Sequence, residues 1–492
     1  MMEHSSSRVI HDSQPATNRV ESLNPSRSIT ALTGRRFHFI GIGGVGMSAL
    51  AQVLLRNHAR VSGSDRHESE MIERLRKRSA TVYVGHDAAH IPDDVDTVVM
   101  SAAVSQDNPE LQRARLRGVR ILKYAEMLGQ LFNHYQGIAI SGTHGKSTTS
   151  GWLSVLLKQA GVDTNFIVGA RCTQLGSSSG VGGSPWFVAE ACEFDRSFLN
   201  LWPYIGCILN IERDHLDYYT DEAEIIAAFA AFAGQVRPEG VLVAYGDDPK
   251  VRLALAQTES QTRQVLFGLN PGNTVRAERL ALVNGLYHFD LIREGHMLGR
   301  TSISLPGRHN VINALAVATV ALEVGLMPEV VLDQLAHFTG VERRTMLKGV
   351  FKQITVLDDY AHHPTEVKAT LEAIRQRYHP KRLWCVFQPH QYSRTRFLLD
   401  DFVESFKLAD VTIVPEIYGV RDSDESRRAV NARVLVQRLC QAGGDARFVD
   451  GVDAICEVLE GNVAPGDVVV TMGAGDIWKV ADEYIQRVGV HC

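Results

Sequence analysis

The chain has 492 residues, of which 45% are hydrophobic and 22% are charged, with a net charge of -5 and a pI near 6.4. This composition is ordinary for a soluble protein and predicts about three domains of roughly 150 residues each. It provides no global basic field, so a nucleic-acid polymer is not indicated as a partner and any anion binding must be local. Seven scattered cysteines without a C-x-x-C pair argue against a disulfide framework or a thiolate zinc site, and favour a cytoplasmic location.

The N-terminal end shows no pattern of a targeting segment. Residues 1–30 are rich in Ser, Asn, Arg and His and lack the apolar run of a signal peptide, which predicts a disordered tail. Residues 37–55 carry no Asp, Glu, Lys or Arg and are about long enough to cross a bilayer. Four glycines between positions 41 and 46 divide this stretch, so we expect a strand, a tight turn and a helix rather than a membrane span.

The turn GIGGVG has the G-x-G-x-x-G spacing of dinucleotide-binding folds, with Gly41, Gly43 and Gly46 at the motif positions. Asp65 follows the first glycine by 24 residues, at the end of a second predicted strand. One interpretation places a diphosphate at the helix N-terminus, with Ser64 and Asp65 near a ribose or base. The other is a tight turn in a structural Rossmann-like layer. The motif does not distinguish between nucleotides.

The α/β pattern restarts twice along the chain. A strand in DTVVMSAAV ends at Ser101, a helix follows, and the first domain is predicted to close near residue 133. A second series begins at residue 134. Residues 275–304 alternate apolar and polar positions around Asn284-Gly285, the signal of a β-hairpin. After residue 340, five further strands alternate with helices, which predicts a third, doubly wound domain. The expected domains are therefore 31–133, 134–340 and 341–492.

The stretch GIAISGTHGKSTTSGWLSVLLKQAG reads as strand, glycine turn, Lys-Ser and helix, which is the form of a phosphate-binding loop. Gly142 and Gly145 would let backbone N–H groups face an anion, Lys146 would reach the outer phosphates, and Ser147 would ligate Mg²⁺. The motif is incomplete, because Ile140 stands where its first glycine belongs. The alternative is an ordinary turn with a surface lysine.

Two further side chains are predicted at the edge of the sheet where Ser147 lies. Glu190 and His215 each follow an apolar strand, and the carboxyl ends of parallel strands form the binding edge of such folds. A carboxylate and an imidazole can both ligate Mg²⁺ or Mn²⁺, although imidazole is the less usual choice. Taken singly, a solvated carboxylate and a hydrogen-bonded loop histidine remain the alternatives. For Asn310 and Asn313, at the start of a long apolar helix, the alternative is helix capping.

The third domain carries several chemistry-bearing residues directly after its first two predicted strands. The first strand is followed by His362 and His363, and the second by His390, Arg394 and Arg396. The histidine pair lacks a carboxylate or cysteine at metal spacing, so the sequence is poor evidence for zinc. A guanidinium fork matches carboxylate or phosphate, so the arginines are expected to hold such anions.

Eight ordered segments together resemble the Mur ligases of peptidoglycan synthesis, over residues 36–480. They are FIGIGGVGMSALA, SGTHGKSTT, EACEFDRSFL, NIERDHLDYY, PGRHNVINALA, DDYAHHPTEV, FQPHQYSRTR and TMGAGDI. The resemblance implies an α/β protein of three domains: an N-terminal Rossmann-like domain for a UDP-sugar, a central P-loop-type ATPase with a mostly parallel sheet, and a C-terminal Rossmann-like domain that closes over both. The segments are most similar to those of members that join L-alanine to UDP-N-acetylmuramate.

The resemblance also implies roles for individual residues. The UDP-sugar would be bound by Gly43, Gly44, Val45, Gly46, Met47, Ser64, Asp65 and Ser101. ATP would be bound by Gly142, Thr143, His144, Gly145, Lys146, Ser147, Thr148, Asn310, Asn313, Arg343 and Asp359. The metal, Mg²⁺ or Mn²⁺, would be held by Ser147, Glu190 and His215. Catalysis would depend on Lys146, His215, His390 and Arg394, the last two also contacting substrate.

In this chemistry the γ-phosphoryl group of ATP activates the lactyl carboxylate as an acyl phosphate, which the amine of alanine attacks. The chain departs from many relatives at Cys192, Phe194 and Gln391, where Asp, Ser and Arg are common. One alternative is a related ligase that attaches a recycled murein tripeptide. Another is a nicotinamide-dependent oxidoreductase, suggested by GIGGVG and Asp65, which would leave the phosphate loop without a function. The sequence does not distinguish a monomer from a dimer.

Overall fold

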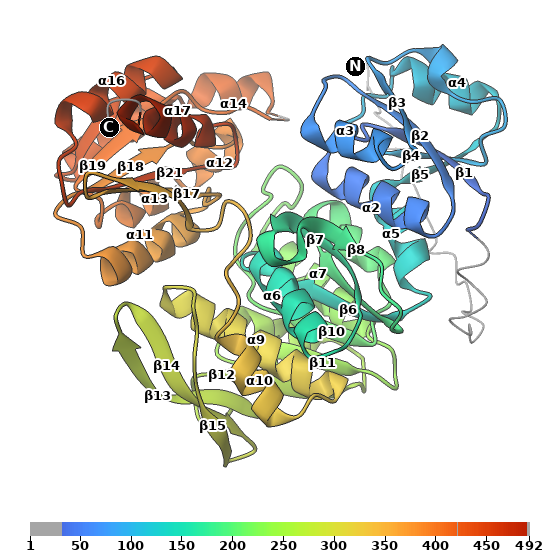
Figure 1. Ribbon diagram of the computed structural model, residues 1–492, viewed down its shortest axis with the longest axis horizontal. Helices are drawn as coiled ribbons and strands as arrows, with labels where there is room; N and C mark the ends of the chain where they lie inside the picture. Colours follow the sequence, from blue (N-terminus) through green and yellow to red (C-terminus); the bar gives the residue numbers. More distant parts are fainter. Residues whose placement is uncertain (1–31, 421, 490–492) are drawn as a thin grey trace, which may run out of the picture.

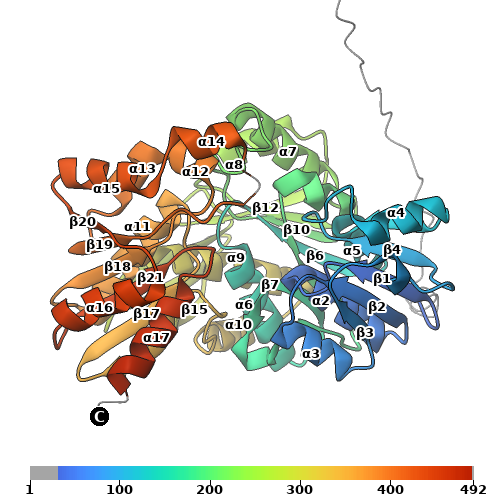
Figure 2. The ribbon, with the colours of Figure 1, turned by 90° about the horizontal axis from the view of Figure 1, so that it is seen from above.

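The computed structural model describes residues 32–420 and 422–489. The tail predicted to be disordered, residues 1–30, lies outside the described residues. The chain forms three α/β bodies, coloured blue, green to yellow, and orange to red in Figure 1, and the second lies between the other two when seen from above in Figure 2. The predicted three-domain α/β fold is confirmed. No helix among the described residues is both long and apolar enough to cross a membrane.

The first body is built on a five-stranded sheet in which every strand pair is parallel. Its strands are β1 (Arg36–Ile40), β2 (Arg60–Asp65), β3 (Thr81–Val84), β4 (Thr97–Met100) and β5 (Arg120–Lys123), in the order β3-β2-β1-β4-β5. Its helices are α2 (Val45–Arg56), α3 (Glu70–Arg76), α4 (Pro109–Leu116) and α5 (Tyr124–Phe132). The strand order reverses between β1 and β4, which is the position where ligands bind in doubly wound sheets.

The central body has a ten-stranded sheet in the order β15-β14-β13-β12-β11-β10-β6-β9-β7-β8. Its strands are β6 (Gln136–Ser141), β7 (Asn165–Cys172), β8 (Ser177–Gly180), β9 (Trp186–Ala191), β10 (Ile205–Ile208), β11 (Val241–Tyr245), β12 (Arg263–Gly268), β13 (Val275–Val283), β14 (Leu286–Arg293) and β15 (His296–Ser302). The inner pairs are parallel, and antiparallel pairs occur at both ends. The predicted hairpin is confirmed, since Asn284 and Gly285 connect β13 to β14 with φ angles of 50° and 73°.

The helices of the central body are α6 (Lys146–Gln159), α7 (Glu222–Gly234), α8 (Pro249–Gln257), α9 (Arg308–Val324) and α10 (Pro328–Leu335). The two long helices α6 and α9 pack against each other. Trp152 of α6 is fully buried and stacks on Phe338 with ring centroids 5.1 Å apart. The helix predicted to start at Asn310 begins two residues earlier, at Arg308.

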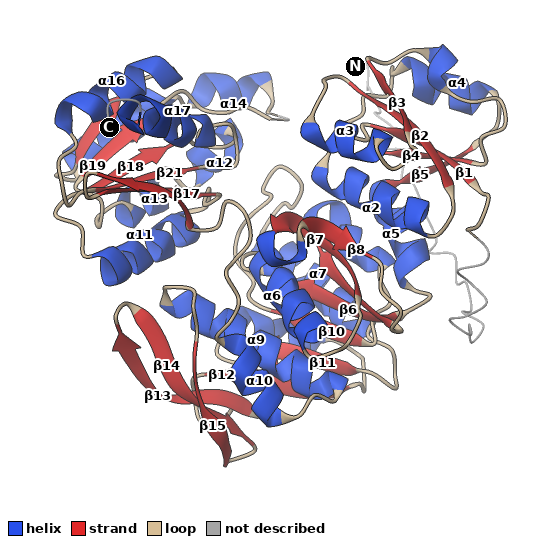
Figure 3. Ribbon diagram, viewed as in Figure 1, coloured by secondary structure: helices blue, strands red, loops and turns tan. Residues whose placement is uncertain are grey.

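The third body has a six-stranded sheet in the order β16-β17-β21-β18-β19-β20, and Figure 3 shows helices on both of its faces. Its strands are β16 (Met346–Phe351), β17 (Ile354–Asp359), β18 (Leu383–Phe387), β19 (Val411–Val414), β20 (Asp445–Phe448) and β21 (Val468–Met472). Its helices are α11 (Pro364–Tyr378), α12 (Tyr392–Phe397), α13 (Leu399–Ser405), α14 (Asp424–Ala429), α15 (Ala432–Gln441), α16 (Val452–Asn462) and α17 (Trp478–Gly489). The five predicted strands all form, and the antiparallel edge strand β16 was not predicted.

The two domain boundaries differ in chemistry. One continuous apolar core joins the first and central bodies, where Phe132 of α5 meets Phe187 of β9 with ring centroids 5.7 Å apart. The two apolar clusters of the third body contain only residues between 354 and 488. Its contacts with the central body include the ion pair of Arg394 with Asp214 and the hydrogen bond that the Thr365 hydroxyl donates to the Glu212 carboxylate. The third body is therefore joined to the rest chiefly through polar contacts.

Candidate active site

The phosphate loop connects β6 to α6 and has the predicted form of strand, turn and helix. Gly142 and Gly145 have φ angles of 137° and 84°, in a region that favours glycine. A Cβ atom on Gly145 would lie 2.6 Å from Oδ1 of Asn313, so glycine is needed for the close approach of α9. Gly145 is the N-cap of α6 and provides no side-chain cap. The first-turn N–H groups of α6 can therefore face an anion.

Lys146 directs its ammonium back over this loop. Nζ donates to the carbonyl oxygens of Gly142 and Thr143, and lies 2.9 Å from Oε2 of Glu193. Burial alone would lower the pKa of Lys146, but the charge of Glu193 raises it above its usual value. The amine is therefore protonated at neutral pH. Glu193 is only 2% exposed and forms a buried ion pair with Lys146.

The predicted metal ligands lie beside Lys146. The Ser147 hydroxyl donates to Oε2 of Glu190 over 3.2 Å, and burial raises the pKa of Glu190. Nε2 of His215 lies 3.7 Å from Oε1 of Glu193, and its Nδ1 is buried without a hydrogen bond to any described residue. A hydroxyl, carboxylates and a buried imidazole nitrogen with unused bonding capacity are donors that fit Mg²⁺ or Mn²⁺. The roles of these residues as ligands remain predictions.

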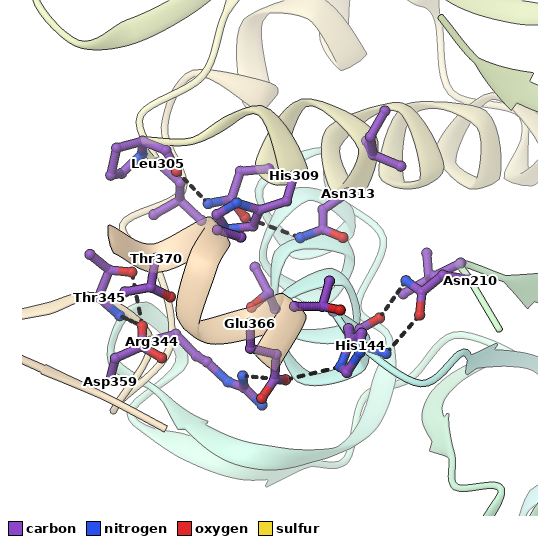
Figure 4. Close-up of a pocket in the computed structure, with 18 of the residues that line it drawn as sticks. His144, Asn210, Leu305, His309, Asn313, Arg344, Thr345, Asp359, Glu366 and Thr370 are labelled. Carbon is purple, nitrogen blue, oxygen red and sulfur yellow. Dashed lines mark hydrogen bonds and ion pairs between the residues drawn. The ribbon is translucent and has the colours of Figure 1, made fainter. Parts of the chain in front are cut away.

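A cavity of about 220 Å³ adjoins the phosphate loop, between the central and third bodies. Figure 4 shows side chains from both bodies around it, including His144, Asn313, Arg344 and Glu366. Of the predicted nucleotide residues, it is lined by His144, Gly145, Thr148, Asn310, Asn313 and Asp359. The cavity is therefore the place where these predictions converge.

Asn310 and Asn313 are in the first two turns of α9, and neither is its N-cap, which is Gly307. Nδ2 of Asn310 donates to the carbonyl oxygen of Pro306 at 2.7 Å, and Nδ2 of Asn313 donates to Oδ1 of Asn310 at 3.0 Å. Both side chains are buried at the wall of the cavity. This ordered pair can present amide groups to a ligand, although adenine recognition itself is untested.

The arginine that lines the cavity is Arg344, whereas the sequence resemblance pointed to Arg343. The guanidinium of Arg343 is bound to Asp358 at 3.2 Å and to the carbonyl oxygen of Gly473 at 2.6 Å. Arg344 faces the cavity and lies 3.3 Å from Oε1 of Glu366. Asp359 also lines the cavity, and burial raises its pKa to about 6 despite the charge of Arg344.

His390 and Arg394 lie together in the third body, beside the central one. Nη1 of Arg394 lies 3.1 Å from Nδ1 of His390, and the ring of Tyr418 stacks on His390 at a centroid distance of 5.9 Å. Nη2 of Arg394 donates to Oδ1 of Asp214 at 2.8 Å. Burial would raise the pKa of Asp214, but Arg394 holds it well below the usual value. The predicted contact of Arg394 with a substrate anion stays a prediction.

A second cavity, of about 550 Å³, lies in the first body at the point where its strand order reverses. Gly43, Gly44, Asp65 and Ser101 line it, as predicted from the glycine turn. Oδ2 of Asp65 accepts a hydrogen bond from the N–H of Gly43 at 2.8 Å. The following residues, Val45, Gly46 and Met47, form the first turn of α2. Gly46 lies against Tyr124, where a Cβ atom would be 3.0 Å from the ring.

Ser64 is fully buried beneath this cavity instead of lining it. Its hydroxyl donates to Oε2 of Glu110 at 2.8 Å, and the same oxygen lies 2.8 Å from Nε2 of His38. Burial would raise the pKa of Glu110, but these bonds and one with His86 lower it. The cluster connects β1, β2 and α4 below the cavity. Sequence analysis did not identify it.

His144 extends from the phosphate loop toward the third body. Its Nδ1 lies 3.3 Å from Oε1 of Glu366, and its Nε2 lies 3.5 Å from Oε2 of Glu212. Burial alone would lower the pKa of His144, but the two carboxylates raise it to about 9. The ring of His363, from the third body, is 4.6 Å away. The loop and the third body are thus in direct electrostatic contact.

Sequence analysis gave no role to six residues of the site, although all but Arg344 lie within the quoted segments. They are Glu193, Asn210, Glu212, His309, Arg344 and Glu366. Glu193 and Glu212 each follow a strand by a few residues, so the strand-end argument used for Glu190 could have identified them. No spacing signal connects Glu366 to the phosphate loop, because they come from different domains.

The sequence matches three domain families in the same order as the three bodies. Residues 36–136 match the Mur ligase family, catalytic domain, residues 140–321 the Mur ligase middle domain, and residues 343–475 the Mur ligase, glutamate ligase domain. Together with the three-domain fold, these matches define the class of protein. The chain belongs to the Mur ligase family.

Its relatives include UDP-N-acetylmuramate–L-alanine ligases from two bacteria. The chain is 41% identical to that of Alkaliphilus metalliredigens, over 91% of this chain and 96% of the relative. It is 40% identical to that of Acetivibrio thermocellus, over 92% and 96%. Among solved structures, the UDP-N-acetylmuramate-alanine ligase of Thermotoga maritima superimposes with a TM-score of 0.79 at 27% identity, covering 93% of this chain and all of that one.

Proposed function

We propose that the protein joins L-alanine to the lactyl carboxylate of UDP-N-acetylmuramate and converts ATP to ADP, a step of peptidoglycan precursor synthesis. The observation that carries this proposal is the identity of about 40% through all three bodies to relatives named for that reaction. A cavity at the phosphate loop and a second one at the glycine turn provide separate places for two nucleotides. The free thiols of the described cysteines accord with a cytoplasmic location.

The phosphate loop is proposed to bind the phosphates of ATP. Lys146 carries a positive charge at the start of α6, and the first turn of this helix has no side-chain cap. These groups would stabilise the negative charge that spreads over the oxygens during phosphoryl transfer. The adenine would lie in the adjoining cavity, between Asn310 and Asn313 of α9 and the cavity wall formed by Arg344 and Asp359.

Ser147, Glu190 and His215 are proposed to hold Mg²⁺ or Mn²⁺, which when bound neutralises phosphate charge. Glu190 would be an anionic ligand and Ser147 a neutral one, and their hydrogen bond keeps both oxygens on the same side of the loop. Glu193 lies between Lys146 and His215 and orients both. Activity should therefore require Mg²⁺ or Mn²⁺ and survive a chelator selective for zinc; inactivation by such a chelator, reversed only by zinc, would contradict this assignment.

The UDP-sugar is proposed to occupy the cavity of the first body, with its diphosphate at the N-terminus of α2. Gly43 and Gly44 leave room for the phosphates, and α2 starts without a side-chain cap.

The lactyl carboxylate, once phosphorylated, becomes an electrophile for the amine of alanine. His390 would bind or deprotonate that amine, and the third body would exclude water from the acyl phosphate. The proposed domains are 31–133, 134–340 and 341–492.

The test is ADP release by the purified protein with UDP-N-acetylmuramate and one of two amino components. Activity with L-alanine and none with the murein tripeptide is the expected result. Activity with the tripeptide alone would favour the recycling ligase. The relatives described above do not support the oxidoreductase alternative, and no absorbance change is expected with nicotinamide cofactors in the absence of ATP.

A further inference from the structure

We propose that His144, Glu212 and His363 form an inhibitory binding site for a transition-metal ion of the zinc class, separate from the magnesium ligands at Glu190. The three residues come from the phosphate loop, the segment after β10 and the segment before α11. A metal ion held there would connect the ATP-binding loop to the third body. Nothing in the proposed ligase reaction requires such an ion.

The distances between the side chains suit a tetrahedral ion. Each residue offers one ligand atom, and all three atoms lie within 4.8 Å of one another. Nε2 of His144 and Nδ1 of His363 lie 3.5 Å and 3.8 Å from Oε2 of Glu212. For metal–ligand bonds of about 2.1 Å, tetrahedral ligand atoms are about 3.4 Å apart. Small side-chain rotations would therefore complete the site.

Each histidine has its other ring nitrogen bound in the way that metal-binding histidines require. Nδ1 of His144 lies 3.3 Å from the Glu366 carboxylate, and Nε2 of His363 lies 3.1 Å from the carbonyl oxygen of Arg213. A carbonyl oxygen can only accept, so His363 carries its proton on Nε2 and has its lone pair at Nδ1. That lone pair accepts a hydrogen bond from the N–H of Thr365 over 3.3 Å, as the N-cap of α11, and a metal ion would replace this contact. Such outer partners fix the tautomer and orientation of zinc-binding histidines.

The atom of His144 that faces the proposed ion has unused bonding capacity. Its Nε2 is buried and makes no hydrogen bond with the residues that the structure describes. Coordination there would release one proton from His144 to solvent. Two imidazoles and one carboxylate favour Zn²⁺, Co²⁺ or Ni²⁺ over Mg²⁺, and three protein ligands leave a fourth position for water.

The site is reached from two sides. His144 and Glu212 line the cavity beside the phosphate loop, whereas Glu212 and His363 line an outer cavity of about 460 Å³. An ion can therefore enter from the outer cavity. The adjacent His362 is not part of the site, because its Nδ1 lies 2.9 Å from the carbonyl oxygen of Tyr360. The ligands thus come from distant segments, and the sequential histidine pair is not the metal-binding unit.

Inhibition follows from where the ligands are attached. His144 lies between Gly142 and Lys146 in the loop proposed to hold ATP, while His363 belongs to the third body. An ion bound to both would keep the third body against the loop and slow nucleotide exchange. It would also hold the His144 side chain at the wall of the nucleotide cavity.

The test measures metal binding by the full chain without nucleotide, after dialysis against a chelator. Wild type is expected to bind one Zn²⁺ tightly, and Co²⁺ in its place should give the strong visible absorption of a four-coordinate ion. His363→Asn and Glu212→Gln should abolish both signals, and Glu366→Gln should weaken binding ten- to a hundredfold. His337→Asn removes an exposed histidine elsewhere and should change nothing.

A second measurement follows ADP release at fixed free Zn²⁺, set with a metal buffer. Zinc should inhibit wild type at concentrations that leave His363→Asn at its own metal-free rate. Thermal unfolding with and without Zn²⁺ checks that each variant is folded, and only proteins that bind the ion should gain stability. Equal zinc affinity in wild type, His363→Asn and Glu212→Gln, or the weak absorption of six-coordinate Co²⁺, would overturn the proposal.

Discussion

Arg394 and Asp214 form a buried ion pair across the boundary between the third and central bodies. Nε and Nη2 of Arg394 both donate to Oδ1 of Asp214, at 3.0 Å and 2.8 Å, and the arginine is 6% exposed. Nη1 of the same guanidinium reaches His390. One arginine therefore connects the position of the third body to the histidine proposed to handle alanine.

This pair can be tested with a double-mutant cycle on kcat/KM for ADP formation. Arg394→Ala should reduce apparent substrate affinity ten- to a hundredfold, and Asp214→Ala should have a similar effect, because each leaves a buried charge unpaired. The double variant should lose much less than the sum of both. Arg396 was also predicted to hold an anion, but it is half-exposed and pairs with Glu425 at 3.6 Å, so Arg396→Ala is the control. Additive effects would mean that Arg394 acts on a substrate anion independently of Asp214.

Gly145→Ala should weaken ATP binding, and Gly161→Ala should not. The two glycines flank α6 and have nearly equal φ angles of 84° and 85°, so both substitutions carry similar backbone strain, about 1 kcal/mol. Only at Gly145 would the new methyl group meet Asn313, whereas nothing lies within 4 Å at Gly161. We expect at least a tenfold rise in the Kd of ATP, or about 1.4 kcal/mol, by calorimetry. Equal affinities in the two variants would show that Asn313 does not shape the site.

Lys146→Ala should abolish ADP formation and leave binding of UDP-N-acetylmuramate nearly intact. The reason is that Lys146 carries a positive charge at the start of α6, where ATP phosphates are proposed to bind, while the second cavity lies in another domain. Lys158→Ala, at the other end of α6, removes a partly exposed lysine and serves as the control. Binding of the UDP-sugar is measured by calorimetry. If a folded Lys146→Ala protein lost both functions, the two sites could not be separate.

Asp359 should make stability depend on pH between about 4 and 6. Its pKa is raised from 3.8 to about 6, chiefly by burial, so the folded state binds more protons than the unfolded state in this window. Its contribution to stability therefore falls as the pH rises. Asp359→Asn has no charge to bury, so wild type should lose up to about 3 kcal/mol relative to this variant between pH 4 and 7. Urea unfolding of both proteins across this range measures the difference, and a constant difference would refute it.

His390→Ala should act mainly on alanine. The ring lies between Arg394 and Tyr418, so its removal should raise the Michaelis constant for alanine or stop the reaction after the acyl phosphate forms. Kinetic constants for each substrate in turn provide the measurement. Unchanged alanine kinetics would place the amino acid elsewhere.

Local patterns were enough to predict the elements that carry the site. The phosphate loop could be recognised because a strand, a glycine turn and a helix follow one another without interruption. Ser64 shows where local reasoning failed, although a signal was present. Successive residues of a strand point to opposite faces, so Ser64 and Asp65 could not both line the cavity.

Arg343 and Arg344 illustrate a limit of another kind. They lie outside any helix or strand, so no periodicity indicates which of them faces the cavity. Arg343 has a φ angle of 59°, which turns the chain at that point. The contact between His144 and Glu366 depends on how two separately folded domains meet. A sequence pattern within either domain contains no information on that placement.

Concentrated sulfate should affect the two domain boundaries in opposite directions. The apolar core shared around Phe132 and Phe187 is strengthened by salts that are excluded from protein surfaces, such as sulfate. The polar contacts of the third body, including Thr365 with Glu212, are weakened where salt screens charges near solvent. Concentrated sulfate would therefore hold the first and central bodies together as one unit. At the same time it would weaken the contacts of the third body, so salt would loosen only one of the two domain boundaries.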